Sequence, residues 1–260
     1  MSVNFHKKPL IKNSNSPLKV ENSVLFLDYL EHFISNANTK RVQGYGTVGL
    51  FHIPSAMMFP EKTFIIGASY IPKPYFQRFG RRLNPGMPTY LNITLFPFME
   101  VMFRYTHELN MRVNPTTKYY PDRMMTFRFK VLKEKKWIPA IVLGFQDITK
   151  ALGISSQKAN NYSASYIVGT KGYNFNTLSI YSTLGYAYDL KNLQSEDYKG
   201  IFGGIEVTHK SHPFTSLILE HNSKQPIFGI RHFFIDRFQL MLGIWDFKKL
   251  TMNLSYHVTL

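Results

Sequence analysis

From Gly46 to its last residue, the sequence is a succession of short runs in which apolar and polar residues alternate, about twelve in all. The last run, LTMNLSYHVTL at 250–260, alternates without a break. A period of two residues indicates β-strands with one apolar and one polar face. Aromatic residues make up 15% of the chain, which also favours strands. The pattern therefore predicts an all-β fold whose strands have different surroundings on their two faces.

The segments between these runs are alternately long and short. The long ones include 73–88, 111–123 and 188–199, and the short ones lie near 133–137 and 210–213. This alternation is typical of an up-and-down barrel in an outer membrane, with long loops outside the cell and short turns in the periplasm. A sandwich with Greek-key crossings has no reason for it.

The final run also fits a barrel, because a closed sheet pairs its last strand with its first and leaves no free edge in lipid. We therefore predict a single up-and-down antiparallel transmembrane β-barrel of about 12 strands, over residues 44–260. The apolar faces are expected to meet lipid. They include Phe64, Ile66, Ala68 and Tyr70 in one run, and Tyr162, Ala164, Tyr166 and Val168 in another.

Residues 1–43 are predicted to form a basic N-terminal arm followed by one short periplasmic helix, NSVLFLDYLEHFISN, which Ser23 can cap. Its apolar stripe consists of Phe26, Tyr29, Leu30 and Phe33. The stripe fits either a packing helix or a helix that binds a partner. The N-terminus lacks the apolar core of a signal peptide, so an exported protein would be numbered here from after its cleavage site.

The formal net charge of the chain is +15, which suggests a polyanion such as nucleic acid, phosphorylated lipid or acidic polysaccharide. There is no cysteine, which excludes a module held together by disulfides. Basic residues of the first two outward loops are the candidates for binding lipopolysaccharide or another polyanion. These residues are Lys73, Arg78, Arg81, Arg82, Arg112, Lys118 and Arg123. The alternative is that they only solvate the loops.

A second set of charged residues lies on the strand faces opposite the apolar ones. These residues are Glu100, Arg104, Arg128, Lys130, Glu206, Glu220 and Arg231. We expect them to face the lumen, because a Lys or Arg facing lipid costs up to ~2–4 kcal/mol at the membrane midplane. They can form salt bridges that fill a narrow barrel, or line a polar path for a solute or polymer. A catalytic carboxylate pair would require Glu206 and Glu220 to lie together with perturbed pKa values.

Three short motifs are only weak indications of a catalytic, cofactor or metal site. GYGTVG at 44–49 matches a dinucleotide fingerprint, but Pro54 interrupts the helix that should follow it. Ser155 and Lys158 match the S-x-x-K motif of penicillin-recognising enzymes without its companion motifs. His209 and His212 have a ligand spacing but no evident third ligand. We therefore expect no metal and no cofactor.

Three blocks of the sequence resemble YjbH-like outer-membrane proteins: GTVGLFHIPSAMMF from Gly46, NITLFPFMEVMFRYT at 92–106 and PAIVLGFQDIT at 139–149. The matching positions are Gly46, Gly49, Leu50, Pro54 and Ala56; Pro97, Phe98, Glu100, Arg104 and Tyr105; and Gly144, Asp147 and Ile148. The segment YIVGTK at 166–171 fits the next block. The resemblance covers roughly residues 45–190, in order.

This resemblance implies a Gram-negative outer-membrane barrel linked to the export or assembly of exopolysaccharide or capsule. It supplies no catalytic residues, so a non-enzymatic role is expected. Because the chain is shorter than full-length family members, it fits a single-barrel subunit of a larger envelope complex. The expected partners are outer-membrane lipid and lipopolysaccharide, with acidic polysaccharide and other envelope proteins (through the arm and helix) as further candidates; nucleic acid is not expected.

Other functions also fit the sequence: an outer-membrane enzyme acting on lipid or polysaccharide, a small-solute porin, and a soluble basic β protein that binds polyanions. Twelve strands leave room for a small pore, which large side chains and the segment around residues 44–60 can also fill.

Overall fold

A computed structural model describes residues 41–77, 84–110, 121–148, 163–189, 199–234 and 237–260, which form one closed antiparallel barrel of 12 strands. The strands are β1 Thr63–Tyr70, β2 Gly86–Phe96, β3 Met99–Glu108, β4 Asp122–Leu132, β5 Ala140–Gln146, β6 Ala164–Asn174, β7 Leu178–Asp189, β8 Gly200–His209, β9 Thr215–His221, β10 Pro226–Phe234, β11 Phe238–Trp245 and β12 Lys249–Thr259. Within these ranges, no helix has the length and apolar character needed to cross a bilayer. The predicted N-terminal arm and helix lie outside the described residues.

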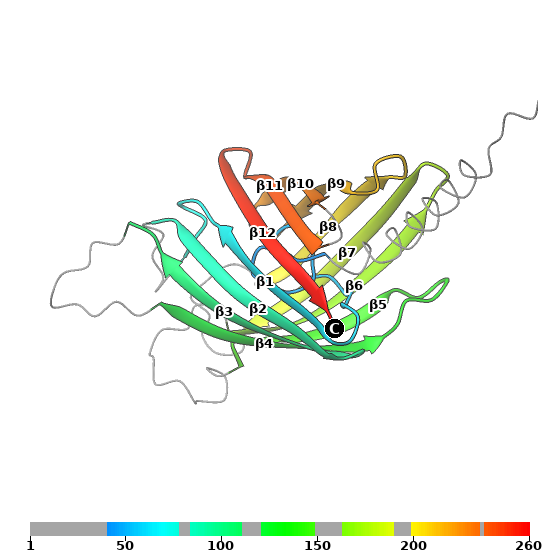
Figure 1. Cartoon of the computed structure of the whole chain (residues 1–260), viewed down its shortest axis with the longest axis horizontal. Coiled ribbons are helices and arrows are strands. Elements are labelled where there is room, and N and C mark those ends of the chain that lie inside the picture. Colours follow the sequence, from blue (N-terminus) through cyan, green and yellow to red (C-terminus); the bar gives the residue numbers. More distant parts are fainter. Residues whose placement is uncertain (1–40, 78–83, 111–120, 149–162, 190–198, 235–236) are drawn as a thin grey trace, which may run out of the picture.

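Each strand pairs with the next one in the sequence, and the last pairs with the first (Figure 1). The closing pair runs from Thr63↔Thr259 to Tyr70↔Met252 without a register shift. This pairing accounts for the unbroken alternation of the final run, because β12 has a hydrogen-bonded neighbour on both sides and a different environment on each face. The predicted closed 12-stranded barrel is confirmed.

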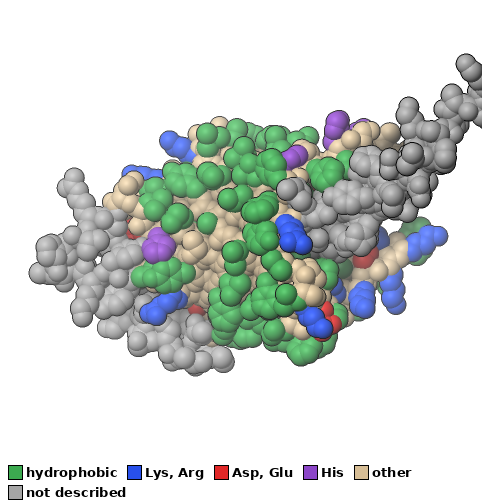
Figure 2. Space-filling model, in the orientation of Figure 1, with side chains coloured by type: hydrophobic (Ala, Val, Ile, Leu, Met, Phe, Trp, Pro, Cys, Tyr) green, Lys and Arg blue, Asp and Glu red, His purple; other side chains and the backbone are tan. Residues whose placement is uncertain are grey.

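The two faces of the sheet differ as the alternation requires. On the outside, large apolar side chains lie side by side across strands; one row is Ile66, Leu91, Phe103 and Met125. Figure 2 shows hydrophobic side chains over the barrel wall. On the inside, side chains such as Asn92, Thr126 and Asn253 are buried. Polar residues therefore lie inside this molecule, and a large part of its apolar surface lies outside.

Strand β6 is an exception to the predicted faces. Tyr166 and Val168 point inwards and are buried, whereas Ile167 is exposed on the outside. The expectation that Ala164, Tyr166 and Val168 face lipid is therefore wrong; Tyr162 lies outside the described residues. The physical reason is that the barrel interior is filled here, so both faces of β6 meet apolar surroundings and its sequence alternates less clearly.

The connections alternate between the two ends of the barrel. The long-loop end carries the connections 71–85, 109–121, 147–163, 190–199, 222–225 and 246–248. The short-turn end carries 97–98, 133–139, 175–177, 210–214 and 235–237, together with both chain ends of the barrel. The predicted long and short segments thus fall at opposite ends, although 222–225 and 246–248 are themselves short.

Candidate functional site

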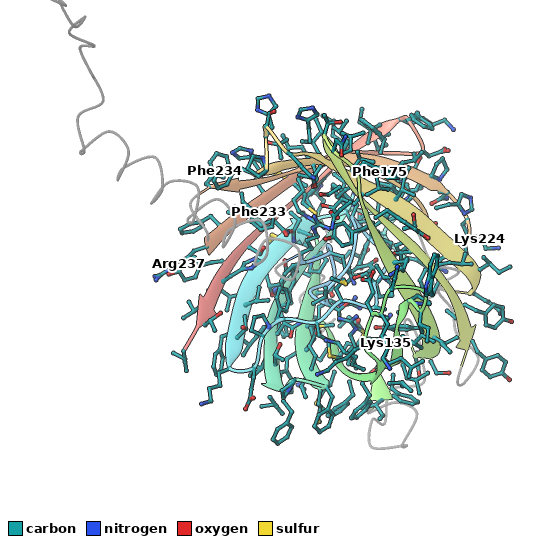
Figure 3. All side chains as sticks on the ribbon, turned by 90° about the vertical axis from the view of Figure 1, so that its right-hand side faces the viewer. Lys135, Phe175, Lys224, Phe233, Phe234 and Arg237 are labelled. Atoms are coloured by element: carbon teal, nitrogen blue, oxygen red, sulfur yellow. The ribbon has the colours of Figure 1, made fainter. Side chains whose placement is uncertain are left out.

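Residues 41–59, here called the interior segment, lie inside the barrel. Figure 3 looks into the short-turn end and shows this part of the chain surrounded by strands. Every side chain from Arg41 to Phe59 is buried except the partly buried Met57. The segment folds back on itself: the N–H of Gly49 donates to the carbonyl of Arg41 (2.9 Å), and the N–H of Gly44 to that of Phe51 (2.7 Å).

Two glycines of the GYGTVG motif are required by this fold. Gly46 has a φ of +99°, and a Cβ there would lie 2.4 Å from the ring of Tyr90. A Cβ on Gly49 would lie 2.1 Å from the carbonyl oxygen of Ile53. Both approaches are far shorter than any real contact, so only glycine fits. The motif builds tight turns inside a barrel, and no helix follows it as a dinucleotide site would require.

Glu220 of β9 holds one turn of the interior segment. Its carboxylate accepts hydrogen bonds from the N–H groups of Phe51 (2.8 Å) and His52 (2.7 Å), and a long one from Ile53 (3.5 Å). Converging backbone N–H groups form a natural site for an anion. Because Glu220 is only 2% exposed, its carboxylate needs hydrogen-bond donors from the protein, and these N–H groups supply them.

Glu206 of β8 and Arg231 of β10 form a second anchor. Nη1 of Arg231 lies 2.6 Å from Oε2 of Glu206, and Nε of Arg41 lies 3.4 Å from Oε1 of the same carboxylate. Nη2 of Arg231 donates to the carbonyls of Gly49 (2.8 Å) and Leu50 (2.5 Å). One buried guanidinium therefore joins a wall carboxylate to the backbone of the interior segment.

Glu100 of β3 and Arg128 of β4 form a third anchor of the same kind. Nη1 of Arg128 lies 2.8 Å from Oε2 of Glu100, and its Nη2 donates to the carbonyls of Ser55 and Met57. Oε1 of Glu100 accepts from the N–H of Val48 (3.3 Å) and from the side chain of Asn92. Both side chains of the ion pair are fully buried. Such pairs hold only when further hydrogen bonds satisfy them, as they do here.

The remaining predicted lumen residues lie nearer the barrel ends. The guanidinium of Arg104 lies 4.3 Å above the ring of Tyr45 in the interior segment and 3.7 Å from Asp122. Lys130 is half-buried on β4, towards the short-turn end. Glu206 and Glu220 engage different groups, an arginine and backbone N–H groups, rather than each other.

Uncharged side chains also hold the interior segment, and the sequence did not single them out. The side chain of Gln239 accepts from the N–H of Val42 (3.0 Å) and donates to its carbonyl (2.8 Å), as a neighbouring strand would. Thr170 accepts from the N–H of Ala56 (2.8 Å). Polar residues at inward positions of an alternating run were the only signal for these contacts.

An aromatic side chain of the interior segment packs on two strand glycines. A Cβ on Gly229 of β10 would lie 2.4 Å from the ring of Phe51, and one on Gly243 of β11 would lie 2.7 Å from it. The two glycines are paired across the strands. They leave a recess in the inner wall that the ring fills.

The predicted polyanion-binding residues are described only in part. Lys73 and Arg123 are exposed at the long-loop end. The other predicted residues, Arg78, Arg81, Arg82, Arg112 and Lys118, lie outside the described residues, as do Ser155 and Lys158.

Of the two histidines with ligand spacing, His209 ends β8 and His212 lies in the turn that follows it at the short-turn end. The rings of His209 and His212 are 6.1 Å apart, centre to centre. Among the described residues, no group of three His, Cys, Asp or Glu side chains is placed to hold a metal ion.

Comparison with known proteins gives one family. No curated protein matches the chain. A family model described as exopolysaccharide biosynthesis protein YbjH matches residues 42–242. This range begins in the interior segment and ends in β11, so it includes all three anchors. The chain therefore belongs to the YjbH family, a family related to exopolysaccharide biosynthesis, and in this member the family sequence forms a filled β-barrel.

Proposed function

We propose that the protein is a non-enzymatic component of the outer membrane of a Gram-negative bacterium, acting in exopolysaccharide or capsule secretion or in envelope assembly. One observation carries the membrane part of this proposal. Among the described side chains of the strands, Arg123 and Lys171 are the only Asp, Glu, Lys or Arg residues at outward positions. Each lies within three residues of a strand end, where a charge facing lipid costs little.

Aromatic residues at both ends of the barrel support the same location. Membrane barrels carry aromatic girdles where the apolar band meets the headgroups. Exposed aromatic side chains at the short-turn end include Phe96, Phe98, Tyr173, Phe175, Phe234 and Phe238, and those at the long-loop end include Tyr70, Tyr105, Tyr186 and Tyr188. Figure 3 shows Phe175 and Phe234 at the edge of the short-turn end. Strands of 7–12 residues match the roughly 9–11 residues that cross a bilayer at a tilt.

The filled interior favours a subunit of a secretion or assembly apparatus over an open conduit or porin. A polymer could cross this lumen only after the interior segment left its three anchors. The buried carboxylates Glu100, Glu206 and Glu220 are already occupied by guanidinium or backbone N–H groups. This occupation supports a role in structure rather than in acid–base chemistry.

The location is tested by fractionation of the native host, followed by gel migration with and without boiling. We expect the protein in the outer-membrane fraction, with a faster folded form that boiling converts to the slower one. Recovery in the soluble fraction without detergent would overturn the proposal and favour the soluble polyanion-binding alternative.

Orientation is tested on intact cells, and the absence of native cysteine makes the labelling clean. A membrane-impermeant maleimide should label Lys224→Cys at the long-loop end and spare Lys135→Cys at the short-turn end. The opposite labelling would reverse the orientation.

The role in polymer secretion needs a separate measurement. Deleting the gene should lower cell-surface and secreted polysaccharide, and the wild-type gene should restore both. Unchanged polymer in the deletion strain would refute the secretion role even if the barrel lies in the outer membrane.

A further inference from the structure

A groove on the outer wall lies across β2, β3 and β4, close to the long-loop end. Its volume is about 540 Å³, within the range of small-molecule sites. Thr89 and Leu91 of β2, Phe103 and Tyr105 of β3, and Met125 of β4 line it with outward-facing side chains.

The strand register explains the shape of the groove. Thr89, Tyr105 and Arg123 lie in one row across the strands, and Leu91, Phe103 and Met125 lie in the next row towards the short-turn end. Because Thr89 is small, it leaves a depression in the surface beside Tyr105. The side chains of the second row give the rest of the groove an apolar lining. An elongated apolar group can therefore lie in it, pointing away from the long-loop end.

Arg123 stands at the end of the groove nearest the long loops. Its side chain is exposed, and it is the only arginine at an outward position in the strands that the structure describes. Its guanidinium makes no hydrogen bond or ion pair with another described residue. An arginine next to apolar surface at a membrane boundary is best satisfied by a phosphate, which its planar fork can bind with two hydrogen bonds.

We propose that this groove binds the phosphorylated lipid anchor of lipopolysaccharide, with one acyl chain along Leu91, Phe103 and Met125 and a phosphate at Arg123. This inference rests on the proposed outer-membrane location, because the long-loop end then faces the outer leaflet. Charge and shape agree on an amphiphile: the only arginine at an outward position of the described strands lies at one end of an apolar groove.

In the experiment, the full chain is purified in detergent and titrated with purified lipopolysaccharide. Native mass spectrometry then measures how much lipopolysaccharide the chain binds. Arg123→Gln should weaken binding about tenfold, the effect of losing one charge-assisted contact of roughly 1.4 kcal/mol. Thr89→Trp should weaken it as well by filling the groove. The matched control is Lys171→Gln, which removes the other outward charge and should leave binding unchanged.

Arg123→Lys keeps the charge without the fork and should fall between wild type and Arg123→Gln. Each variant is first checked for its folded gel form, so that loss of binding is not loss of the barrel. Equal binding by Arg123→Gln and Lys171→Gln would overturn the site. Equally tight binding of phosphatidylglycerol in a parallel titration would overturn the assignment to lipopolysaccharide. A barrel found in the outer membrane with unchanged binding would refute only this inference, whereas a soluble protein would refute the proposed function.

Discussion

The recess that holds Phe51 is a sensitive point of the structure, and Gly229→Ala tests it. The added Cβ would lie 2.4 Å from the ring of Phe51 and 3.4 Å from the carbonyl oxygen of Leu242. The ring cannot simply withdraw, because the N–H of Phe51 is held by Glu220 at 2.8 Å. Overpacking of this kind typically costs about 1–3 kcal/mol. We expect Gly229→Ala to lower the free energy of unfolding by that amount.

The assay is unfolding in urea of the protein in detergent or lipid, followed by the loss of its folded gel form. The matched control is Gly169→Ala on β6. A Cβ there meets nothing closer than 3.8 Å, which is an ordinary contact, and this glycine has no positive φ. The control should therefore unfold at nearly the wild-type urea concentration.

The double variant separates a clash with Phe51 from a general effect on β10. Phe51→Ala alone should cost about 3–5 kcal/mol, as other buried phenylalanines do. In its presence, Gly229→Ala should add almost nothing, so the two changes should be strongly non-additive. Strict additivity, or equal stability of Gly229→Ala and Gly169→Ala, would refute the placement of the ring.

Three other results are expected. Leu254 is 48% exposed in the middle of β12, so Leu254→Arg should cost up to ~2–4 kcal/mol and lower the amount of folded barrel in the membrane fraction. Leu260→Arg at the chain end should assemble normally, and equal assembly of the two variants would contradict a lipid-facing Leu254. Arg128→Met should lower the stability of the barrel in urea by about 3–5 kcal/mol, because Glu100 loses its partner. The double variant Glu100→Leu/Arg128→Met should recover part of that stability, and no recovery would contradict the buried ion pair. Trp245 is 1% exposed and lies 4.5 Å from the ring of His52, so its fluorescence in Trp137→Phe should resist quenching by iodide, whereas the 84% exposed Trp137 that remains in Trp245→Phe should be quenched readily. Similar quenching of the two variants would contradict the filled interior.

The strand pattern was predictable because each strand has two different environments. The final run shows this most clearly: Leu254 is exposed on the outside, and its neighbour Asn253 is buried with hydrogen bonds to Ser69 and Tyr90. Prediction failed on β6, where Tyr166 and Val168 meet a filled interior. Alternation shows that the two faces of a strand differ, but it does not show which face points into the barrel.

The contents of the interior were harder to predict. The charged residues Glu100, Arg128, Glu206, Glu220 and Arg231 were all singled out by the sequence, and the structure places them inside the barrel. The salt bridges Glu100–Arg128 and Glu206–Arg231 are of the kind that the sequence suggested. The other partners were not predictable, because most are backbone groups of the interior segment. Backbone N–H and carbonyl groups are the same at every residue, so no sequence pattern shows that Glu220 will bind the N–H of Phe51.

The positions that carry the family resemblance meet in this interior. Gly46 and Gly49 shape the turns of the interior segment, and Glu100 and Arg104 of β3 contact it. The resemblance therefore describes how the barrel is filled more than how it meets lipid.

This filling limits how a polymer could use the lumen. The Glu220 and Arg231 anchors together hold the interior segment by about five hydrogen bonds, each worth on the order of 1 kcal/mol net. Releasing the segment from these anchors alone would cost on the order of 5 kcal/mol. Because Arg128, Gln239 and Thr170 also hold it, the open barrel makes up at most about one molecule in several thousand. A spontaneous open pore is thus a rare state. Any opening during secretion would require a partner that binds the released segment or the emptied wall more tightly than the closed form by at least that free energy.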